Sequence, residues 1–544
     1  MTLKTMTIAA ATLLLTLSSC CDASKKQCGE CSELETSAQS TLVQTDKGQV
    51  AGYIDGGIFT YKGIPYAKAE RFMAPQPADS WEGVRSSRAY GPTAPQGKRT
   101  GWYSDEQAFA FDWNDGFPDE DCLRVNVWTP GINDGKKRPV MVWLHGGGFS
   151  AGSGQELPSY DGASLARKGD VVVVTLNHRL NVLGFLDLSS FGEKYANSGN
   201  AGLLDLITAL NWVKTNIEAF GGDASNVTIF GQSGGGGKVS TLLATPSAAG
   251  LFHKAIIQSG SMLRTMDQKW SAKIGEEVVA EFGSVEALAT APYEQLLAAG
   301  ESAIAKIRPE AEASGYAGFI FGWAPTVDGN ILPAQMFDTQ APEQSKDIPV
   351  MLGSTIHEFT ISAYVPQFRN IGKAGAVEYL KTTYGDRTDE YVSIFEKTYP
   401  EYKPIDLIDT DAIFRPGTIA QANVKVAQQG APVYVYMFTW ESPVLDGIFR
   451  STHCMEIPFV FNNADLHASM TGGGQEAIAL ADRMSQAWIN FARTGNPNAE
   501  GLPQWPAYNP EEGATMIFDN NCEIKYNHDK ELMEFIRQFP TRGF

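Results

Sequence analysis

Short runs of apolar residues without polar alternation recur along the chain beyond residue 40. A strand whose two faces are both buried in a parallel sheet has this pattern. Helical spacing fills the segments between the runs, as in 203–220, which ends at Gly221 and Gly222, a pair typical of a helix stop. Strands that alternate with helices predict an α/β fold, with a mostly parallel central sheet flanked by helices. The runs that carry this prediction lie at 140–144, 171–176, 227–230, 255–257, 348–352 and 433–438.

The length of 544 residues would by itself suggest several domains. After residue 40, however, the sequence contains no linker, internal repeat or low-complexity block. We therefore expect residues 41–544 to form a single domain. The formal net charge of −19 argues against nucleic acid as a partner, because nucleic-acid-binding surfaces are basic.

The N-terminus has the pattern of an export signal. Lys4 precedes an apolar run from Ile8 to Leu17, about half the length needed to span a bilayer, so we expect residues 1–19 to be a signal peptide. The segment 17–20, Leu-Ser-Ser-Cys, resembles a bacterial lipobox, whose cysteine is lipidated and becomes the mature N-terminus. This predicts a lipoprotein attached to a membrane or the cell surface through Cys20. Ordinary cleavage nearby, giving a periplasmic or extracellular protein, is the alternative.

Residues 20–40 contain almost no large apolar side chain. Such a segment cannot bury enough surface to offset its chain entropy, so we expect a flexible tether that carries the lipid. Cys28 and Cys31 lie within it without a second pair of metal ligands. A small disulfide or idle thiols are therefore favoured over a zinc or redox site.

The segment Gly231-Gln232-Ser233-Gly234-Gly235 follows the run 227–230 and precedes residues that can start a helix. This is the G-x-S-x-G pattern in the strand–turn–helix setting in which it presents a nucleophilic serine. The flanking glycines suit a sharp turn in which larger side chains would clash. We expect Ser233 to be the nucleophile; a structural glycine-rich turn is the alternative.

A phosphate-binding loop is excluded for the same segment. That pattern requires a glycine six residues before Lys238, where this chain has Gln232, and a serine or threonine after the lysine, where it has Val239.

His145-Gly146-Gly147-Gly148 follows the run 140–144 and matches the HGGG motif of oxyanion holes. Acyl transfer develops negative charge on the substrate carbonyl oxygen, which backbone N–H groups can stabilise. The expected donors are the N–H groups of Gly147, Gly148 and Gly234. His145 is expected to support this loop rather than to transfer protons, and a plain glycine turn is the alternative.

In enzymes with this serine motif the acid and then the histidine follow the serine along the chain. The histidines that follow the last apolar run are His453, His467 and His528. We expect His453 to be the base and keep His467 as the alternative. Glu358, shortly after the run 348–352, is the expected acid, because a carboxylate there would accept the imidazole N–H. A solvated glutamate at a loop end is the alternative.

Several motifs together resemble the type-B carboxylesterase and cholinesterase-like family of α/β-hydrolases, from about residue 50 onward. The resemblance implies an α/β-hydrolase fold, with Ser233 as nucleophile, Glu358 as acid, His453 as base and Ser259 as a supporting serine near the acid. The motifs are 63–67 (GIPYA) with 71–72, 120–123 (EDCL) with 126–128 (NVW), 177–180 (NHRL) with 184–185, and 220–223 (FGGD) with 226–228.

The chain departs from the family pattern at three places. Gln232 stands where the family has glutamate, and Gly234 where it has alanine. Ala94 stands where the family often has the disulfide partner of the EDCL cysteine, so Cys122 is expected to lack its usual partner. Whether Cys454 pairs with Cys522 stays open.

The segment 101–117 is rich in aromatic residues, and in the family it borders the mouth of the active site. It either offers an aromatic surface to an apolar substrate or packs its rings against the protein. The aromatic residues are Trp102, Tyr103, Phe109, Phe111, Trp113 and Phe117.

Together these observations predict a serine carboxylic-ester hydrolase that acts on small-molecule esters through an acyl-enzyme on Ser233. No metal or organic cofactor is expected. A related lipase or amidase is the first alternative. A non-catalytic relative that uses the fold for binding is the second, and loss of the serine, acid or histidine would signal it.

Overall fold

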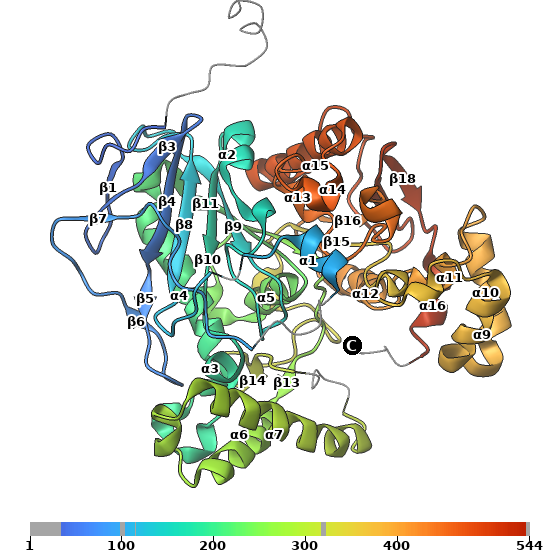
Figure 1. Cartoon of the computed structure of the whole chain (residues 1–544), viewed down its shortest axis with the longest axis horizontal. Coiled ribbons are helices and arrows are strands. Elements are labelled where there is room, and N and C mark those ends of the chain that lie inside the picture. Colours follow the sequence, from blue (N-terminus) through green and yellow to red (C-terminus); the bar gives the residue numbers. More distant parts are fainter. Residues whose placement is uncertain (1–33, 98–103, 115, 317–321, 540–544) are drawn as a thin grey trace, which may run out of the picture.

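The computed structural model describes residues 34–97, 104–114, 116–316 and 322–539 (Figure 1). The expected signal peptide, Cys20, Cys28 and Cys31 lie outside these residues. The expected tether extended to residue 40, but Glu35 already forms an antiparallel bridge with Ile54, through hydrogen bonds of 3.0 and 2.8 Å. Its last residues are therefore joined to the sheet.

Within the described residues, eleven strands form one sheet in the order β18-β17-β16-β15-β12-β11-β9-β10-β8-β4-β3 (Figure 1). Neighbours from β10 through β17 run parallel, whereas the pairs at the two edges run antiparallel. This confirms the predicted mostly parallel sheet. The strands are β3 (Tyr53–Asp55), β4 (Ile58–Pro65), β8 (Arg124–Thr129), β9 (Arg138–Leu144), β10 (Val172–Leu176), β11 (Gly222–Gln232), β12 (Lys254–Gln258), β15 (Val350–Thr355), β16 (Val433–Phe438), β17 (Ala514–Phe518) and β18 (Glu523–Tyr526).

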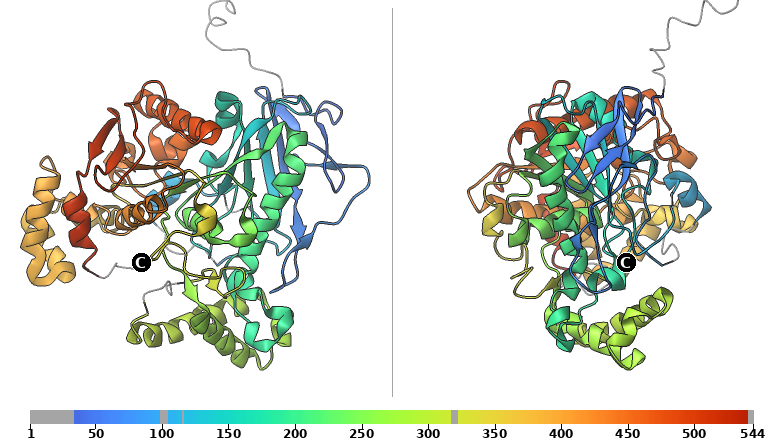
Figure 2. Two further views of the ribbon diagram at one scale, coloured as in Figure 1. Left: turned by 180° about the vertical axis from the view of Figure 1, so that it is seen from behind. Right: turned by 90° about the vertical axis from the view of Figure 1, so that its left-hand side faces the viewer.

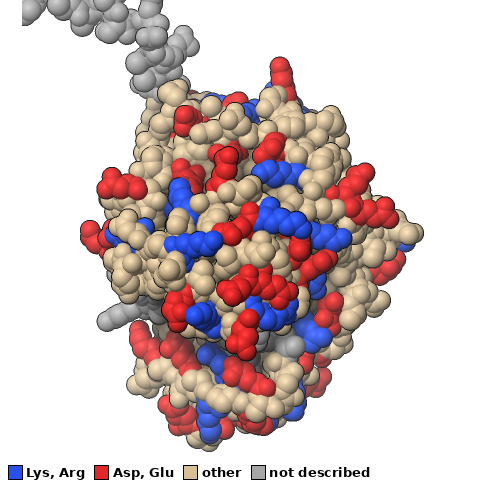
Figure 3. Space-filling view, turned by 90° about the vertical axis from the view of Figure 1, so that its right-hand side faces the viewer, with Lys and Arg blue, Asp and Glu red and all other residues tan. Residues whose placement is uncertain are grey.

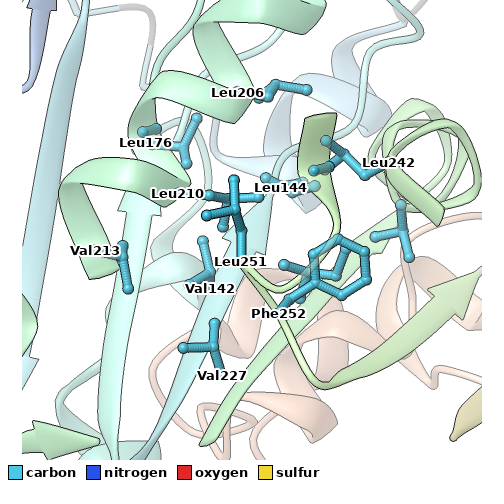
Figure 4. Close-up of a cluster of buried hydrophobic side chains, with 14 of the residues drawn as sticks. Val142, Leu144, Leu176, Leu206, Leu210, Val213, Val227, Leu242, Leu251 and Phe252 are labelled. Atoms are coloured by element: carbon cyan, nitrogen blue, oxygen red, sulfur yellow. The ribbon is translucent and has the colours of Figure 1, made fainter. Parts of the chain in front are cut away.

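The six predicted runs lie in β9, β10, β11, β12, β15 and β16. Their lack of alternation has the expected cause, because both faces of the sheet are covered. In β9, Val142 and Leu144 pack into one buried cluster, while Met141 and Trp143 pack into another on the opposite face. Figure 4 shows the first cluster, in which side chains of β9 meet those of the long helix between β10 and β11.

That helix, α4 (Ala201–Asn216), was predicted as 203–220. It ends at Asn216 and continues as a 3-10 turn to Phe220, and Gly221 stops it with φ 77°. On the same face lies α5 (Gly234–Ala244), and α2 (Ala163–Gly169) and α15 (Gln475–Thr494) cover the opposite face. The sheet is thus flanked by helices on both sides, as predicted.

Other helices extend this core. The pair α6 (Gln268–Phe282) and α7 (Tyr293–Ala313) packs together beyond one end of the sheet in all views (Figures 1 and 2). A second group at the β18 side comprises α9 (Lys373–Tyr384), α10 (Thr388–Thr398) and α16 (Lys530–Ile536). Shorter helices near the site are α1 (Asp105–Phe111), α12 (Phe414–Val426), α13 (Ile457–Val460) and α14 (Ala468–Thr471).

The surface is mixed in charge. On the face shown in Figure 3, lysine and arginine side chains are interspersed with aspartate and glutamate. None of the helices in the described ranges combines the length and the apolar character needed to cross a bilayer.

Candidate active site

Ser233 sits in a sharp turn between β11 and α5. Its backbone has φ 58° and ψ −125°, and its N–H donates to the Gln258 carbonyl of the neighbouring strand at 2.8 Å. The turn leaves no room for side chains at its glycines. A Cβ on Gly231 would lie 2.6 Å from the Leu144 carbonyl oxygen, and a Cβ on Gly235 would lie 1.9 Å from the same atom. The glycines therefore permit the strained turn that presents Ser233.

Glu358 and His453, predicted from separate parts of the chain, are in contact. Glu358 follows β15, His453 follows β16, and both are buried. Nδ1 of His453 pairs with Oε2 of Glu358. The other carboxylate oxygen accepts the Thr355 backbone N–H at 2.8 Å. Glu358 is thus a buried partner of the imidazole rather than a solvated glutamate.

Burial determines the proton affinity of this pair. It raises the pKa of Glu358, although the Ser259 hydroxyl and the Thr355 N–H counter part of the rise. Burial also lowers the pKa of His453, and the nearby carboxyls of Glu456 and Asp411 oppose that change. Because the two groups share a hydrogen bond, they titrate as a unit.

The imidazole of His453 is held on several sides. The rings of Phe359 and Phe414 stack on it, with centroids 4.8 and 5.2 Å away. Nε2 of Gln232 lies 3.2 Å from each ring nitrogen, and the Cys454 thiol donates to Oε1 of Gln232 at 3.2 Å. The sequence analysis noted Gln232 as a departure from the family and phosphate-loop patterns, and Cys454 as a cysteine whose pairing stayed open. It assigned neither a place in the site, although Gln232 precedes Ser233 and Cys454 follows His453 directly in the chain.

The HGGG segment forms a tight loop against the start of α5. Gly147 and Gly148 have φ of 81° and 61°, which other residues rarely adopt. A Cβ on Gly234 would lie 2.4 Å from the Gly148 nitrogen and 2.2 Å from its oxygen. Gly234 opens α5, where N–H groups have no partner within the helix. Nδ1 of His145 lies 2.9 Å from the Gly146 oxygen, so this ring supports the loop as expected.

Two further residues singled out from the sequence, Ser259 and His467, lie in different places. Ser259 is buried beside Glu358 with φ 46°. His467, the alternative base, lies in a different contact: its Nδ1 is 2.5 Å from the Ser159 hydroxyl and its Nε2 is 3.0 Å from the Ala110 carbonyl. It therefore joins three segments of the chain in a buried contact.

A cavity of about 700 Å³ joins these elements, a size typical of small-molecule sites. Ser233, His453, Gly147 and Gly148 line it, and Phe359 and Trp323 add aromatic surface. Helix α7 lines it with residues at helical spacing, which share one face: Leu297, Glu301, Ile304 and Arg308.

The aromatic segment 101–117 divides between the two predicted roles. Trp102 and Tyr103 lie outside the described residues. Phe111 is buried and stacks on Trp113 at 5.0 Å, and Trp113 lines the cavity. Phe109 and Phe117 are more than half exposed, at 55% and 56%.

The described cysteines, Cys122, Cys454 and Cys522, are free thiols, so the pairing of Cys454 with Cys522 that the sequence left open is absent. Cys122 is buried without a disulfide partner, as expected from Ala94. In the part of the chain that the structure describes, no group of three or more histidine, cysteine, aspartate or glutamate side chains is placed to hold a metal ion.

Comparisons with known proteins agree on one family. A family model described as "Carboxylesterase family" matches residues 39–536. The chain is similar to the para-nitrobenzyl esterase of Bacillus subtilis (strain 168), with 38% identity over 92% of this chain and 99% of the relative. It is also similar to the phenmedipham hydrolase of Pseudarthrobacter oxydans, with 31% identity over 89% and 96% of the two chains.

Solved structures give the same result. An esterase from anaerobic Clostridium hathewayi, described as able to hydrolyse aliphatic aromatic polyesters, superposes with a TM-score of 0.81 at 39% identity, covering 91% of this chain and 98% of that one. A carboxylesterase of Geobacillus stearothermophilus superposes with a TM-score of 0.74 at 36% identity, covering 91% and 99%.

Proposed function

The chain belongs to the carboxylesterase family and is a carboxylic ester hydrolase, and from this premise we propose that it acts through an acyl-enzyme on Ser233. In this proposal His453 is the general base, Glu358 is the acid of the triad, and the N–H groups of Gly147, Gly148 and Gly234 form the oxyanion hole. The contact between Glu358 and His453, in the loops that follow the adjacent strands β15 and β16, carries the proposal together with the cavity that His453 and Ser233 both line.

Acylation starts when His453 removes the Ser233 proton as the hydroxyl oxygen attacks the ester carbonyl carbon. Glu358 accepts a hydrogen bond from the Nδ1–H of the imidazole, which leaves Nε2 as the basic nitrogen, and the negative charge of Glu358 stabilises the imidazolium that forms. The carbonyl oxygen becomes an oxyanion that accepts hydrogen bonds from the glycine N–H groups. His453 then protonates the leaving alcohol as the tetrahedral intermediate collapses.

Deacylation repeats these steps with water as the nucleophile. His453 removes a proton from water, the oxyanion hole stabilises the second tetrahedral intermediate, and the carboxylic acid leaves as Ser233 regains its proton. The cavity volume supports a small-molecule ester as substrate. An amide would need the same residues with a poorer leaving group, so the relative rates on matched esters and amides separate an esterase from an amidase.

The first test is hydrolysis of a short-chain p-nitrophenyl ester by the purified protein, beside Ser233→Ala. We expect clear turnover that falls by roughly a thousandfold or more in the variant. Activity that survives the substitution would show that Ser233 is not the nucleophile. A folded parent that neither turns over nor reacts with a fluorophosphonate probe would favour the non-catalytic, binding relative. Stronger activity on emulsions than on soluble esters would favour a lipase.

We also propose that the protein is exported and lipidated at Cys20. The lipobox-like segment before Cys20 supports this. Labelled palmitate should be incorporated into the full-length protein in a bacterial host, and Cys20→Ala should abolish the incorporation. Equal incorporation into both proteins would exclude Cys20 as the site.

A further inference from the structure

A lysine is buried directly under the HGGG loop. Lys238 lies in α5, one turn beyond Ser233, and its side chain is fully buried. Its Nζ donates to the His145 carbonyl at 2.8 Å and lies 3.5 Å from the Gly146 carbonyl. A buried ammonium is costly, and the positive end of a helix is an unfavourable place for a cation. The reaction scheme above makes no use of it.

The two histidine rings near Lys238 carry no charge, so the positive charge in this part of the core belongs to Lys238. The rings of His145 and His178 stack 5.2 Å apart, and burial holds the pKa of each well below its ordinary value, so both are neutral. Burial also lowers the pKa of Lys238, to about 7, and the Glu156 carboxylate opposes this change. The ring of Phe149 lies 5.8 Å from Nζ.

The carbonyls that Lys238 contacts belong to the peptide groups that lead into the predicted oxyanion donors. The Gly146 carbonyl shares its peptide group with the Gly147 N–H. A cation at a carbonyl oxygen polarises the amide and makes the N–H on its other side a stronger donor. The same contacts fix the loop, whose Gly147 and Gly148 have left-handed backbone conformations.

We propose that Lys238 is a positioning residue for the oxyanion hole: its ammonium fixes the carbonyls of His145 and Gly146, and thereby orients and polarises the Gly147 N–H. This inference rests on the proposed function of the loop. Since the oxyanion exists only in the transition state and the tetrahedral intermediates, loss of Lys238 affects kcat rather than substrate binding.

A matched control is available elsewhere in the chain. Lys425, in α12, is also buried, donates to the Lys346 carbonyl at 3.0 Å, and has a pKa lowered by burial. Lys425→Met therefore removes a buried lysine that holds a backbone carbonyl without touching the cavity residues. Lys238→Met removes the donor and the charge, whereas Lys238→Gln keeps a neutral donor.

We expect Lys238→Met to lower kcat about tenfold to a hundredfold, less than the loss of a direct oxyanion donor, with KM changed less than about threefold. Affinity for a trifluoromethyl ketone, which forms a tetrahedral adduct on serine, should fall by the same factor. The kcat and ketone affinity of Lys238→Gln should lie between those of the parent and of Lys238→Met. Those of Lys425→Met should match the parent. The parent should also lose part of its kcat as rising pH deprotonates Lys238, and this loss should be missing in Lys238→Met.

A folded Lys238→Met that keeps its kcat and ketone affinity within twofold overturns the proposal, as does a loss of kcat with unchanged ketone affinity. If neither Lys238 variant folds, the test is the pH profile of the parent. A parent whose kcat does not fall at alkaline pH overturns the proposal. Ser233→Ala in the same assay distinguishes failure of the proposed function from failure of the Lys238 proposal. If the parent hydrolyses no ester, or Ser233→Ala retains activity, the proposed function has failed; if only the Lys238 outcomes fail, the proposed function stands.

Discussion

The backbone N–H of His453 donates to the backbone carbonyl of Glu358 at 2.7 Å, so these residues are joined by their main chains as well as by their side chains. The loop after β16 is thereby attached to the loop after β15 independently of the carboxylate. The position of the imidazole and the charge beside it can therefore be changed separately.

Glu358→Gln should leave His453 in place and remove the charge that stabilises its imidazolium. We expect kcat to fall about a thousandfold to ten-thousandfold, as in other triads that lose the acid, with a small change in KM. Steady-state kinetics on a p-nitrophenyl ester measure this, and a thermal melt shows whether the fold is retained. A loss below tenfold in a folded variant would contradict the role of Glu358.

The acid side of the pH profile should belong to the Glu358–His453 pair. Burial raises the pKa of the acid and lowers that of the base, and the reactive form has Glu358 ionised and His453 neutral. As pH falls the pair gains a proton and activity is lost, so log kcat/KM should rise with unit slope along this acid limb. The partial loss at higher pH belongs to Lys238 and is a separate limb of the profile. A profile flat from about pH 5 to 8 would count against His453 as the base.

Gln232→Glu should move this acid limb to higher pH. The new carboxylate would lie where the Gln232 amide now lies, 3.2 Å from both imidazole nitrogens. A negative charge at that distance favours the imidazolium and raises its pKa by about 1–3 units. Activity at pH 6 should fall relative to the maximum of the profile. An unchanged limb would mean that the side chain at 232 does not face the imidazole in solution.

Gly234→Ala should reduce activity, although the family has alanine there. The added methyl would lie 2.2–2.4 Å from the backbone of Gly148, so the loop must move. We expect kcat to fall about tenfold to a hundredfold, because displacement of catalytic groups by about 1 Å is costly. Gly237→Ala, in the same helix, is the control, because a Cβ there would meet nothing closer than 3.4 Å. Equal kinetics for the two variants would exclude a tight loop contact.

Glu456→Gln should stabilise the fold more at pH 8 than at pH 5. Glu456 is buried, Gln258 donates to its Oε1 at 3.3 Å, and burial raises its pKa to about 7. A raised folded-state pKa gives stability that is present below the unfolded-state pKa and is lost as pH rises through the folded-state value. The gain at pH 8 should be roughly 1–3 kcal/mol. Denaturant melts at both pH values measure it, and a gain independent of pH would contradict it.

The parts of the fold and site that follow local rules could be predicted from the sequence. The apolar runs gave the central parallel strands because burial on both faces removes polar alternation. Ser233, Glu358 and His453 were predicted because each follows such a run. Chain order left both His453 and His467 as possible bases; in the structure His453 contacts Glu358, whereas His467 contacts Ser159 and Ala110. The bridge of Glu35 to Ile54, within the segment predicted as tether, is a long-range contact that composition does not reveal.

The contacts around the site could not be predicted. Lys238 entered the sequence argument only as a residue that fails a phosphate-loop pattern, yet it lies under a loop about ninety residues earlier in the chain. The contact of Gln232 with Cys454 likewise joins the ends of β11 and β16. Such contacts depend on the packing of strand ends, which local propensity does not determine.

Helix α7 contributes one face to the cavity, whereas Ser233, Glu358 and His453 come from loops at the ends of sheet strands. This part of the cavity wall and the groups proposed for bond cleavage therefore have separate supports. An exchange on the α7 face should alter the shape of the cavity while the strand-end loops keep their geometry.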